Sequence, residues 1–421
     1  MRKNLLRSGF RVPAVLGILM YFNIHCGSCA PAERDLPSLV TVFSQTLSGT
    51  HDATVCRNQR IIVALSGGVD SAVAALLMRR QGYVVSGVFM KNWEDEDTEG
   101  DCPSREDLID AVAVAERLGI DIEVVNFAAE YRERVFGRFL AELQAGRTPN
   151  PDVVCNREVK FKACLDHALS LGGGSMATGH YARIAHRDGQ LQLLRGIDPA
   201  KDQSYFLYML GQAQLARSLF PIGSMRKLEV RAAAAEARLA VHDKPDSTGI
   251  CFIGERRFRP FLSRYLPITP GEIRNLEGEV IGEHPGVVYY TLGQREGLGI
   301  GGVKGALEAP WYVLEKDLKN NVLVVGQGHE HPRLLCRSLE ASSLHWVAPR
   351  PPMLPLRCTV KTRYRQADQP ATITAIGADR CRLVFEAPQW AVTPGQAAVF
   401  YREEVCLGGA TIDHVFHGAP R

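Results

Sequence analysis

Apolar positions follow one pattern up to about residue 257 and a different pattern after it. Between Arg60 and residue 257, short apolar runs alternate with segments in which apolar residues recur every three or four positions. The short runs predict buried strands, and the recurring positions predict amphipathic helices. Strands that alternate with helices in this way indicate an α/β fold with a parallel, doubly wound sheet.

Strands and helices can be assigned to most of this first part. The predicted strands are IIVAL (61–65), YVVSGVFM (83–90), DIEVVNF (121–127) and the end of SMATGH (175–180). The predicted helices are Val69–Arg80, Arg105–Leu118, Tyr131–Ala145 and Glu158–Leu171. Polar motifs follow several of the strands directly. Because ligands of such sheets bind at the carboxyl ends of the strands, we expect the active site at that edge.

Short strands replace this alternation in the second part of the chain. Runs punctuated by Gly and Pro come first, and from about Cys336 short alternating segments such as LRCTVKTRY (356–364) follow. This spacing predicts a small β-barrel or sandwich. The predicted division is therefore an N-terminal extension (1–58), a catalytic α/β domain (59–262), a small central domain (263–332) and a C-terminal β-barrel (333–421).

Composition places the chain among soluble globular proteins. Its 421 residues, 46% hydrophobic and 23% charged, are enough for two or three domains. The net charge of +3 allows a basic patch without requiring nucleic acid. No apolar run of about 20 residues occurs outside the first 25 or so, so we expect no membrane span.

The N-terminal extension is open to three interpretations. Residues 1–32 contain no Asp or Glu, and four basic residues precede the apolar run VPAVLGILMYF (12–22). Such a segment is typical of a secretory signal or an organellar presequence. A start codon assigned too far upstream is the interpretation that we favour, since the chain after Arg60 has the pattern of an intracellular enzyme.

A Gly-Gly loop lies between the first predicted strand and the first predicted helix. In Ser-Gly-Gly-Val-Asp-Ser (66–71), backbone N–H groups at a helix N-terminus can form a concavity for an anion. Ser66 and Ser71 add hydroxyl groups, and Asp70 can hold the loop or a magnesium ion. Because the Lys of a Walker loop is missing, we expect a pyrophosphate leaving group rather than a transferred γ-phosphate. An ordinary strand-to-helix turn is the alternative.

Two of the eleven cysteines lie in polar segments rich in Gly or Pro. Cys155 follows GRTPNPDVV before a predicted helix, where the helix N-terminus favours the thiolate. Cys251 lies in the segment DSTGICFIG, where a small sulfur carrier could move. The other nine are expected to be buried apolar residues. Without a reliable CxxC pair we expect no zinc or other metal site, and an iron–sulfur cluster is kept as a minor alternative.

Nine motifs along the chain resemble those of one family. They are ALSGGVDSAVAALL, GVFMKNW, GRTPNPDVVCN, ATGHYAR, KDQSYFL, GICFIG, YTLGQREGLGIGG, PWYV and TVKTRYRQ. The first is similar to the pyrophosphate loop of the ATP-pyrophosphatase superfamily. Together, in this order and over roughly residues 59–410, they resemble the tRNA-specific 2-thiouridylases. This resemblance implies an adenine nucleotide alpha hydrolase-like (Rossmann-like) sheet, a small central domain and a tRNA-binding C-terminal β-barrel.

The resemblance also implies roles for particular residues. Cys251 is expected to carry a persulfide, Cys155 to be the second catalytic cysteine, and Asp152 to move a proton. The residues expected to bind ATP are Ala64, Leu65, Ser66, Gly67, Gly68, Val69, Asp70, Ser71, Met90 and Gly179. The residues expected to contact the target base are Asn150, Pro151 and Asp152. The residues expected to contact tRNA elsewhere are His180, Lys201, Asp202, Gln203, Arg363, Tyr364 and Gln396.

The implied reaction replaces the C2 oxygen of the wobble uridine (position 34) by sulfur, using ATP and Mg²⁺. Adenylation turns the oxygen into a leaving group, the persulfide sulfur or released sulfide attacks C2, and a Cys155–Cys251 disulfide forms. The implied partners are Lys, Glu and Gln tRNAs and a cysteine desulfurase or sulfur-relay protein. The implied location is the bacterial cytoplasm, or the mitochondrial matrix if the extension is a presequence.

Two rival functions use part of the same pattern. An amide-forming adenylating ligase needs the pyrophosphate loop but neither Cys155 nor Cys251. A catalytically inactive RNA-binding protein needs the basic side chains but not the loop glycines or the cysteines, all of which are present.

Overall fold

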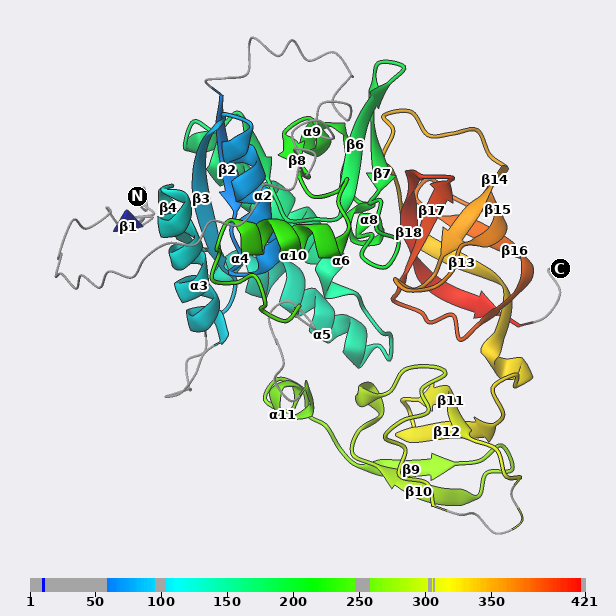
Figure 1. Ribbon diagram of the computed structural model, residues 1–421. Helices are drawn as coiled ribbons and strands as arrows, with labels where there is room; N and C mark the ends of the chain where they lie inside the picture. Colours follow the sequence, from blue (N-terminus) through cyan, green and yellow to red (C-terminus); the bar gives the residue numbers. More distant parts are fainter. Residues whose placement is uncertain are drawn as a thin grey trace, which may run out of the picture.

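The computed structural model describes residues 10–11, 59–94, 103–246, 258–301, 305 and 307–417. Apart from a two-residue strand, β1 (Phe10–Arg11), the N-terminal extension and its predicted origin lie outside the described residues. Cys251 lies outside them as well. Figure 1 shows an α/β domain in blue to green, a β-barrel in orange and red beside it, and a small yellow-green domain below them.

A parallel sheet forms the centre of the α/β domain, as predicted. Its strand order is β1-β4-β3-β2-β5-β8, and all neighbours after the antiparallel β1–β4 pair are parallel. The parallel strands are β2 (Arg60–Ala64), β3 (Val84–Lys91), β4 (Ile122–Asn126), β5 (Ser175–Ala177) and β8 (Ser218–Leu219). Their apolar side chains point alternately to both faces, so both faces need a helical layer.

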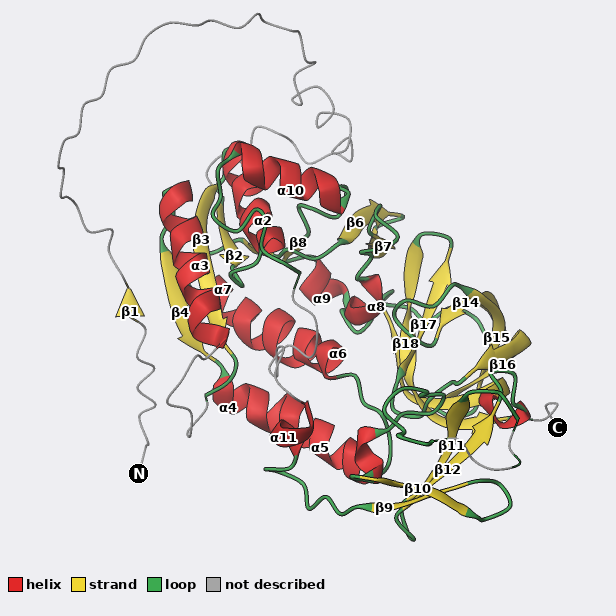
Figure 2. Ribbon diagram, turned by 60° about the horizontal axis from the view of Figure 1, so that its bottom comes forward, coloured by secondary structure: helices red, strands yellow, loops and turns green. Residues whose placement is uncertain are grey.

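Helices cover both faces of this sheet (Figure 2). One face packs, through a continuous apolar cluster, against α2 (Val69–Arg80), α3 (Pro103–Leu118) and α10 (Lys227–Glu236). The other face packs against two long interrupted helices. The first of these consists of α4 (Ala128–Tyr131), η1 (Arg132–Phe136) and α5 (Gly137–Gln144), and the second of α6 (Pro151–Cys155), η2 (Asn156–Cys164) and α7 (Leu165–Ser170).

The start of the second interrupted helix differs from the prediction. We expected a helix from Glu158, whereas the structure begins it at Pro151, seven positions earlier. Asn150 stands at the N-cap in an extended conformation, and proline is favourable at the first helical position because its missing N–H has no acceptor there. Cys155 therefore lies inside a helix and not before one.

A hairpin of the α/β region belongs to the barrel sheet, which the sequence analysis did not foresee. Strands β6 (Ala182–Arg187) and β7 (Gln190–Arg195) extend the barrel sheet through pairing of β7 with β18 (Val405–Phe416). The barrel itself closes where β13 (Leu335–Trp346) pairs with β18. Its remaining strands are β14 (Leu356–Lys361), β15 (Gln369–Ala375), β16 (Cys381–Trp390) and β17 (Ala397–Arg402).

The central domain is a small four-stranded sheet in the order β10-β9-β12-β11. Its strands are β9 (Gly271–Arg274), β10 (Val280–His284), β11 (Trp311–Asp317) and β12 (Val322–Gln327). The remaining short helices among the described residues are α8 (Ser204–Leu207), α9 (Gln212–Leu215), α11 (Phe258–Leu262), η3 (Val287–Tyr289) and η4 (Pro332–Leu334).

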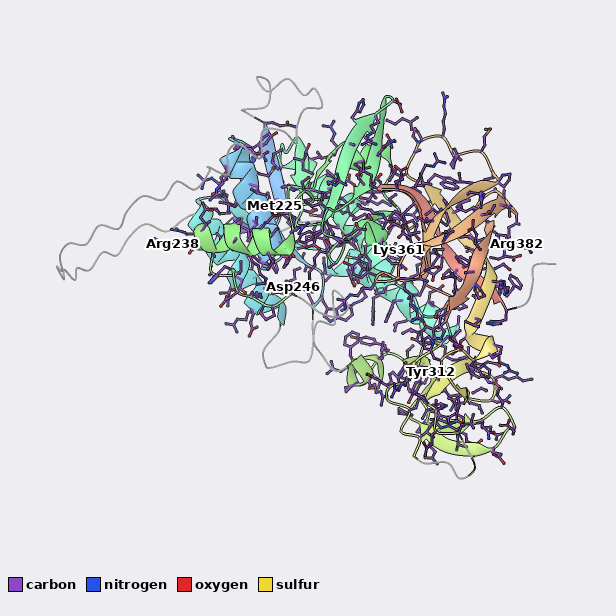
Figure 3. All side chains as sticks on the ribbon, turned by 45° about the vertical axis from the view of Figure 1, so that its right-hand side comes forward. Met225, Arg238, Asp246, Tyr312, Lys361 and Arg382 are labelled. Atoms are coloured by element: carbon purple, nitrogen blue, oxygen red, sulfur yellow. The ribbon has the colours of Figure 1, made fainter. Side chains whose placement is uncertain are left out.

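Polar contacts between buried groups fix the barrel on the α/β domain. The Tyr205 hydroxyl donates to the Ala397 carbonyl at 2.9 Å, and the hydroxyls of Ser204 and Tyr401 lie 3.2 Å apart. One cluster of buried apolar residues contains both Cys155 of α6 and Val399 of β17, so the α/β domain and the barrel share a core. Figure 3 marks Lys361 where the barrel meets the α/β domain and Tyr312 in the central domain.

The described part of the chain contains no helix that is long and apolar enough to cross a membrane.

Gly409 tests the shared core. A Cβ atom at this position of β18 would lie 2.7 Å from both the Tyr208 ring and the Ala398 carbonyl oxygen. Gly409→Ala should therefore lower the free energy of unfolding by about 1–3 kcal/mol, measured by urea denaturation. The control is Gly377→Ala in the same domain, where the nearest atom would be 3.5 Å away. Equal midpoints for the two variants would contradict the packing described.

Candidate active site

The Gly-Gly loop leaves β2 at the carboxyl edge of the sheet, as expected. Ser71 Oγ donates to the Gly68 carbonyl and accepts from the Ser66 amide, both at 3.1 Å. The amides of Gly67 and Gly68 find no acceptor among the described residues. Two unused N–H groups at the start of a 12-residue helix, beside the exposed Ser66, form the kind of concavity that binds an anion.

Lys244 holds the outer side of this loop. Its Nζ donates to the Gly67 carbonyl at 3.1 Å and to Asp107 Oδ1 at 2.8 Å, and it also pairs with Asp110. Gly67 has a φ of +76°, and a Cβ there would lie 2.2 Å from the Asp107 carbonyl oxygen. Only glycine can occupy this position without a shift of the backbone.

Asp70 already has two partners in the structure. The Tyr181 hydroxyl donates to its Oδ1 at 2.7 Å, and Lys227 Nζ lies 2.7 and 2.9 Å from its two oxygens. Burial, followed by the charge of Asp70, raises the pKa of Tyr181 far above its usual value, so that hydroxyl remains a donor. Both sequence predictions for Asp70, holding the loop or holding a magnesium ion, remain predictions, because these two partners lie outside the loop.

A magnesium ion fits this edge only together with phosphate oxygens. The described residues contain no group of three or more His, Cys, Asp or Glu side chains placed to hold a metal. Mg²⁺ is, however, commonly bound by one or two carboxylates plus the phosphates of a substrate. Asp70 could supply one such carboxylate in exchange for Lys227.

The turn after β5 lies directly against the first turn of α2. A Cβ on Gly179 would be 2.6 Å from the Asp70 carbonyl carbon and the Ser71 nitrogen. Met90, another residue predicted to bind ATP, is half-buried at the end of β3 and is paired with Val125 of β4. The structure thus brings Gly179 to the loop. Met90 lies near the carboxyl end of β3, the strand next to the one from which the loop leaves.

His180 is buried rather than presented to solvent. Its Nδ1 lies 2.7 Å from Thr178 Oγ1, its Nε2 lies 3.5 Å from Lys160 Nζ, and its ring packs against Phe161 and Phe220. Burial and the Lys160 charge lower the pKa of His180 well below its usual value, so the ring is neutral. The predicted tRNA contact of His180 remains a prediction, which would require this side chain to become accessible.

Asp152 and Cys155 lie three positions apart on α6 and share one side of the helix. Cys155 is 1% exposed, and the helix widens into π-helical turns directly after it, at η2. Such turns are frequent at functional sites. Because the helix starts at Pro151, Cys155 stands beyond the first turn, where the helix dipole acts less on a thiol than we expected.

The disulfide implied by the family resemblance is not supported. No disulfide joins the described cysteines, and Cys251 lies outside the described residues.

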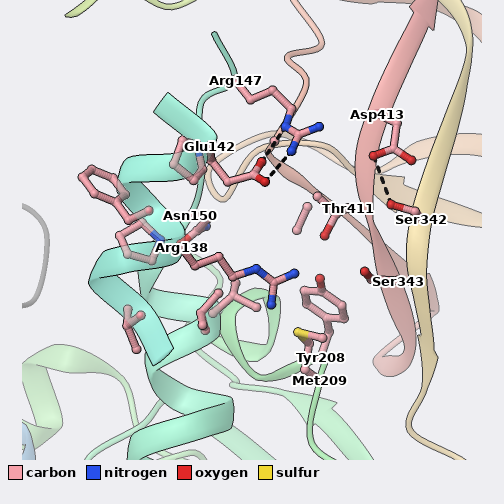
Figure 4. A pocket seen from close by; sticks show the side chains of 18 residues that line it. Arg138, Glu142, Arg147, Asn150, Tyr208, Met209, Ser342, Ser343, Thr411 and Asp413 are labelled. Carbon is pink, nitrogen blue, oxygen red and sulfur yellow. Dashed lines mark hydrogen bonds and ion pairs between the residues drawn. The ribbon is translucent and has the colours of Figure 1, made fainter. Parts of the chain in front are cut away.

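The loop before α6 is held by the barrel. Gln396 Nε2 donates to the Thr148 carbonyl at 2.7 Å, and the Thr148 amide donates to the Pro394 carbonyl at 2.9 Å. A cavity of about 240 Å³ lies between this loop, α5 and the barrel (Figure 4). Its lining includes Asn150 and Pro151 but neither Asp152 nor Cys155, so the cavity borders another side of α6.

The predicted tRNA contacts at 201–203 have partners within the α/β domain. Asp202 is 4% exposed and accepts from the amides of Gly196 and Ser204, both at 3.1 Å. Gln203 Oε1 accepts from the Tyr181 amide at 2.9 Å, and Lys201 forms an ion pair with Asp246. Of these contacts, the bond from the Tyr181 amide to Gln203 supports the turn that carries Gly179 and His180.

Two of the predicted tRNA contacts in the barrel, Arg363 and Tyr364, lie where the barrel meets its neighbouring domains. The Arg363 guanidinium donates to the Leu292 carbonyl at 3.1 Å and the Ala391 carbonyl at 2.7 Å, and it faces the Trp390 ring. The Tyr364 ring packs 4.5 Å from Phe206. Arg363 thereby links the central domain to the barrel, and its predicted contact with tRNA is not tested by these positions.

Sequence reasoning missed Tyr181 and Lys227 as members of the site. Lys227 is the first residue of α10, and its ammonium lies 2.7 Å from Asp246 as well as from Asp70. Burial alone would raise the pKa of Asp246, but Lys201 and Lys227 outweigh it and lower that pKa to about 2. No local motif predicts the contacts with Asp70, because Tyr181 and Lys227 lie 111 and 157 positions from it in the sequence.

Three family models match consecutive parts of the chain. A tRNA methyl transferase HUP domain matches residues 59–255, a tRNA methyl transferase PRC-barrel domain matches 259–327, and an aminomethyltransferase beta-barrel domain matches 336–412. These matches agree with the observed sheet, central domain and barrel.

Several similar proteins align with nearly all of the region from residue 59 onward. The tRNA-specific 2-thiouridylase MnmA of Methylococcus capsulatus is 59% identical over 364 residues, which are 86% of this chain and 98% of that protein. The protein of the same name from Pasteurella multocida is 58% identical over 85% of this chain and 94% of its own length. That of Escherichia coli O1:K1 is 58% identical over 84% of this chain and 97% of its own length.

Gly179→Ala tests the close approach at the loop. The added methyl group must push the β5 turn away from α2, because both nearest atoms belong to the backbone. We expect the affinity for ATP, measured by calorimetry, to fall at least ~10-fold, or about 1.4 kcal/mol. Gly211→Ala, whose nearest atom would be a side-chain oxygen 3.4 Å away, is the control and should bind normally. Normal affinity in both variants would rule out this geometry.

His180 gives the stability a pH dependence of known sign. The folded state keeps the ring neutral, while the unfolded chain takes up a proton near pH 6.5, so acid favours unfolding. The free energy of unfolding should fall between pH 7 and pH 5 by at most about 1.4 kcal/mol per pH unit from this group. In His180→Gln the free energy of unfolding, measured by denaturation, should change less with pH. His186→Gln, at an exposed position, should show the same change with pH as the unaltered protein. Identical slopes would show that the ring is not buried neutral.

Proposed function

This chain belongs to the tRNA-specific 2-thiouridylase family, and we propose that it replaces the C2 oxygen of the wobble uridine of tRNA by sulfur at the expense of ATP. The observation that carries the proposal is the loop of Ser66 to Ser71 at the carboxyl end of β2, where the Gly67 and Gly68 amides have no acceptor among the described residues. Relatives that bear the 2-thiouridylase name are 58–59% identical over almost their whole length.

ATP supplies the driving force for a difficult substitution. A uracil carbonyl is a weak electrophile, and its oxygen does not leave by itself. Attack of that oxygen on the α-phosphate forms a C2–O–AMP bond and releases pyrophosphate, which the loop amides and Ser66 would hold. The residues proposed to bind ATP are Ala64, Leu65, Ser66, Gly67, Gly68, Val69, Asp70, Ser71, Met90 and Gly179. Mg²⁺, when bound, would neutralise phosphate charge beside Asp70.

Sulfur enters from a persulfide on Cys251 in this proposal. Its terminal sulfur attacks C2, and AMP departs with the former carbonyl oxygen. The Cys155 thiolate attacks Cys251 Sγ and breaks the Sγ–S bond, either after the sulfur has bonded to C2 or before, with release of sulfide; the two cysteines supply the two electrons and are afterwards returned to thiols by an external thiol reductant. Cys155 is the proposed second reactive cysteine and Asp152 the proposed proton carrier, since they share one side of α6. Cys155 is buried in the structure, so it must become accessible before it reacts.

The tRNA is proposed to meet both the α/β domain and the barrel. Asn150, Pro151 and Asp152 stand at the start of α6, on a loop that the barrel fixes through Gln396. His180, Lys201, Asp202, Gln203, Arg363, Tyr364 and Gln396 retain their proposed involvement in tRNA binding. For Gln203 the bond from the Tyr181 amide supports an indirect part, through the turn after β5. Asp202 would act through the amides of Gly196 and Ser204, from which it accepts hydrogen bonds. The barrel (333–421) would bind the RNA by shape.

Partners and compartment follow from the same family membership. We propose Lys, Glu and Gln tRNAs as substrates and a cysteine desulfurase or relay protein as the sulfur source. The relatives named above are bacterial, which supports a cytoplasmic location.

Methyl transfer is the second candidate, because two family models carry that description. It requires neither ATP cleavage to AMP nor a reactive cysteine. The presence of the pyrophosphate loop favours thiolation.

The proposal is tested with full-length protein, unmodified tRNA, ATP, Mg²⁺ and a cysteine desulfurase. Thiolation retards the tRNA on a mercury-containing gel. We expect the unaltered protein to thiolate the tRNA, and Cys155→Ser and Cys251→Ser to lose at least ~100-fold of that rate, or about 2.7 kcal/mol of transition-state stabilisation. Cys164→Ser is the matched control: this cysteine is also buried, beside Met176, and burial raises its pKa to about 12.

Three results would argue against the proposal. Full activity of Cys155→Ser or Cys251→Ser would remove the cysteines from the reaction. AMP formation without sulfur in the tRNA would indicate another adenylating enzyme. A methylated product would support the second candidate.

A further inference from the structure

The cavity between α5, the loop before α6 and the barrel contains polar side chains that no protein group satisfies. Arg138 of α5, Asn150 at the N-cap of α6 and Ser343 of β13 all line it. Their side chains form no hydrogen bond or ion pair with any residue that the structure describes. All three are at least partly exposed, so a ligand can reach them from solvent. A few polar groups that converge on one concave site are typical of a binding site.

The charges of the cavity are unevenly distributed. At one end the Arg147 guanidinium donates to both oxygens of Glu142, with Nε 2.6 Å from Oε2, and Ser342 donates to Asp413 at 3.0 Å. At the other end Arg138 has no carboxylate partner among the described residues (Figure 4). A guanidinium group binds phosphate oxygens through two parallel hydrogen bonds. This end of the cavity therefore favours a phosphate group.

The rest of the lining suits a flat, partly apolar group. Tyr208, toward which the Arg138 guanidinium extends, is 1% exposed, and burial raises its pKa to about 12, so the hydroxyl keeps its proton. The volume of about 240 Å³ is smaller than the pockets of about 300–1000 Å³ that hold drug-sized ligands, so we expect one nucleotide at most. The apolar part of the wall is formed by Val135, Phe139, Val153, Val154, Met209 and Ala397.

The backbone of β13 is distorted where it forms the wall of the cavity. Its pairing with β18 shifts between Ser342 and His345, and Ser343 between them has a φ of +54°. A positive φ is uncommon for a residue other than glycine, and irregular pairing of this kind often turns a side chain toward a site. The distortion thus accompanies one of the three polar side chains without a partner.

The cavity adjoins the residues proposed to meet the target base. Asn150 and Pro151 line it, whereas Asp152 and Cys155, which share another side of α6, do not. A group bound in the cavity is therefore not the reacting uridine but lies near it. Proteins recognise single-stranded RNA through unstacked bases that pack on side chains and form hydrogen bonds at their edges.

We propose that this cavity binds a second nucleotide of the tRNA, with its phosphate on Arg138 and the edge of its base on Asn150 and Ser343. Binding there holds the RNA strand beside the reacting uridine. The choice of tRNA rests on the proposed function, whereas the cavity and its unpaired side chains do not. A free mononucleotide offers the same chemical groups, and the experiments below distinguish the two.

The first experiment measures the binding of unmodified tRNA to the full-length protein by filter retention, without ATP and at several salt concentrations. Arg138→Met should raise the Kd at least ~10-fold and reduce the slope of log Kd against log salt by about one, because one phosphate contact is lost. Since Arg138 is exposed, the midpoint of urea denaturation should not change.

Arg134→Met is the matched control. This arginine is also exposed and has no partner among the described residues, and it lies four positions earlier on the same long helix, outside the cavity lining. The variant loses the same charge and should bind tRNA as tightly as the unaltered protein.

The second experiment replaces single nucleotides of the anticodon loop, other than the wobble uridine, by abasic ones. One replacement should weaken binding to the unaltered protein. The same replacement should weaken binding to Arg138→Met by a smaller factor, because both changes affect one bound nucleotide and their effects do not add.

Three results would overturn the proposal. The first is an equal Kd and salt dependence of Arg138→Met and the unaltered protein, and the second is abasic effects that are the same in both proteins at every position. The third is binding of uridine or adenosine monophosphate, measured by calorimetry, that Arg138→Met loses while it keeps its affinity for tRNA. None of these experiments requires sulfur transfer, so the thiolation assay reports separately on the proposed function.

Discussion

The close approach of the β5 turn to the first turn of α2 is the constraint on which the rest of the site depends. There is no room for a Cβ atom at Gly179, and this contact brings the Tyr181 hydroxyl to Asp70. Asp70 in turn positions Lys227, and Lys227 reaches Asp246. A single backbone contact therefore fixes the phosphate loop, the start of α10 and the approach to the cysteine segment in one geometry.

The barrel acts on this geometry from the other side. Its residues Pro394 and Gln396 hold the backbone of Thr148, three positions before the helix of Asp152 and Cys155 begins. The β6–β7 hairpin, which follows the Gly179 turn directly, continues the barrel sheet through β18. Both the turn after β5 and the loop before α6 are thus connected to the barrel.

The sequence pattern predicted those elements whose limits depend on neighbouring residues in the sequence. The alternation of apolar runs gave the parallel sheet, and Val69–Arg80 was predicted to the residue because a glycine pair precedes it and Gln81-Gly82 ends it. The start of α6 was wrong, since Pro151 was read as a loop residue although it is favourable at a first helical position. The Lys227 bridge and the hairpin in the barrel could not be predicted, because they join residues from distant parts of the sequence. The burial of His180 and Asp202 could not be predicted for the same reason. A polar motif indicates that a side chain has a role at the site, but not whether it contacts the ligand or supports a turn that does.

The central claim is that ATP activates the C2 oxygen of the uridine, so that this oxygen leaves with AMP. The most direct test uses tRNA whose wobble uridine carries ¹⁸O at C2, in a single turnover with ATP, Mg²⁺ and a persulfide donor, followed by mass spectrometry of the products. The account predicts one ¹⁸O atom in the phosphate of each AMP released per thiolated uridine. Recovery of the label in water or in pyrophosphate, with AMP unlabelled, would contradict it.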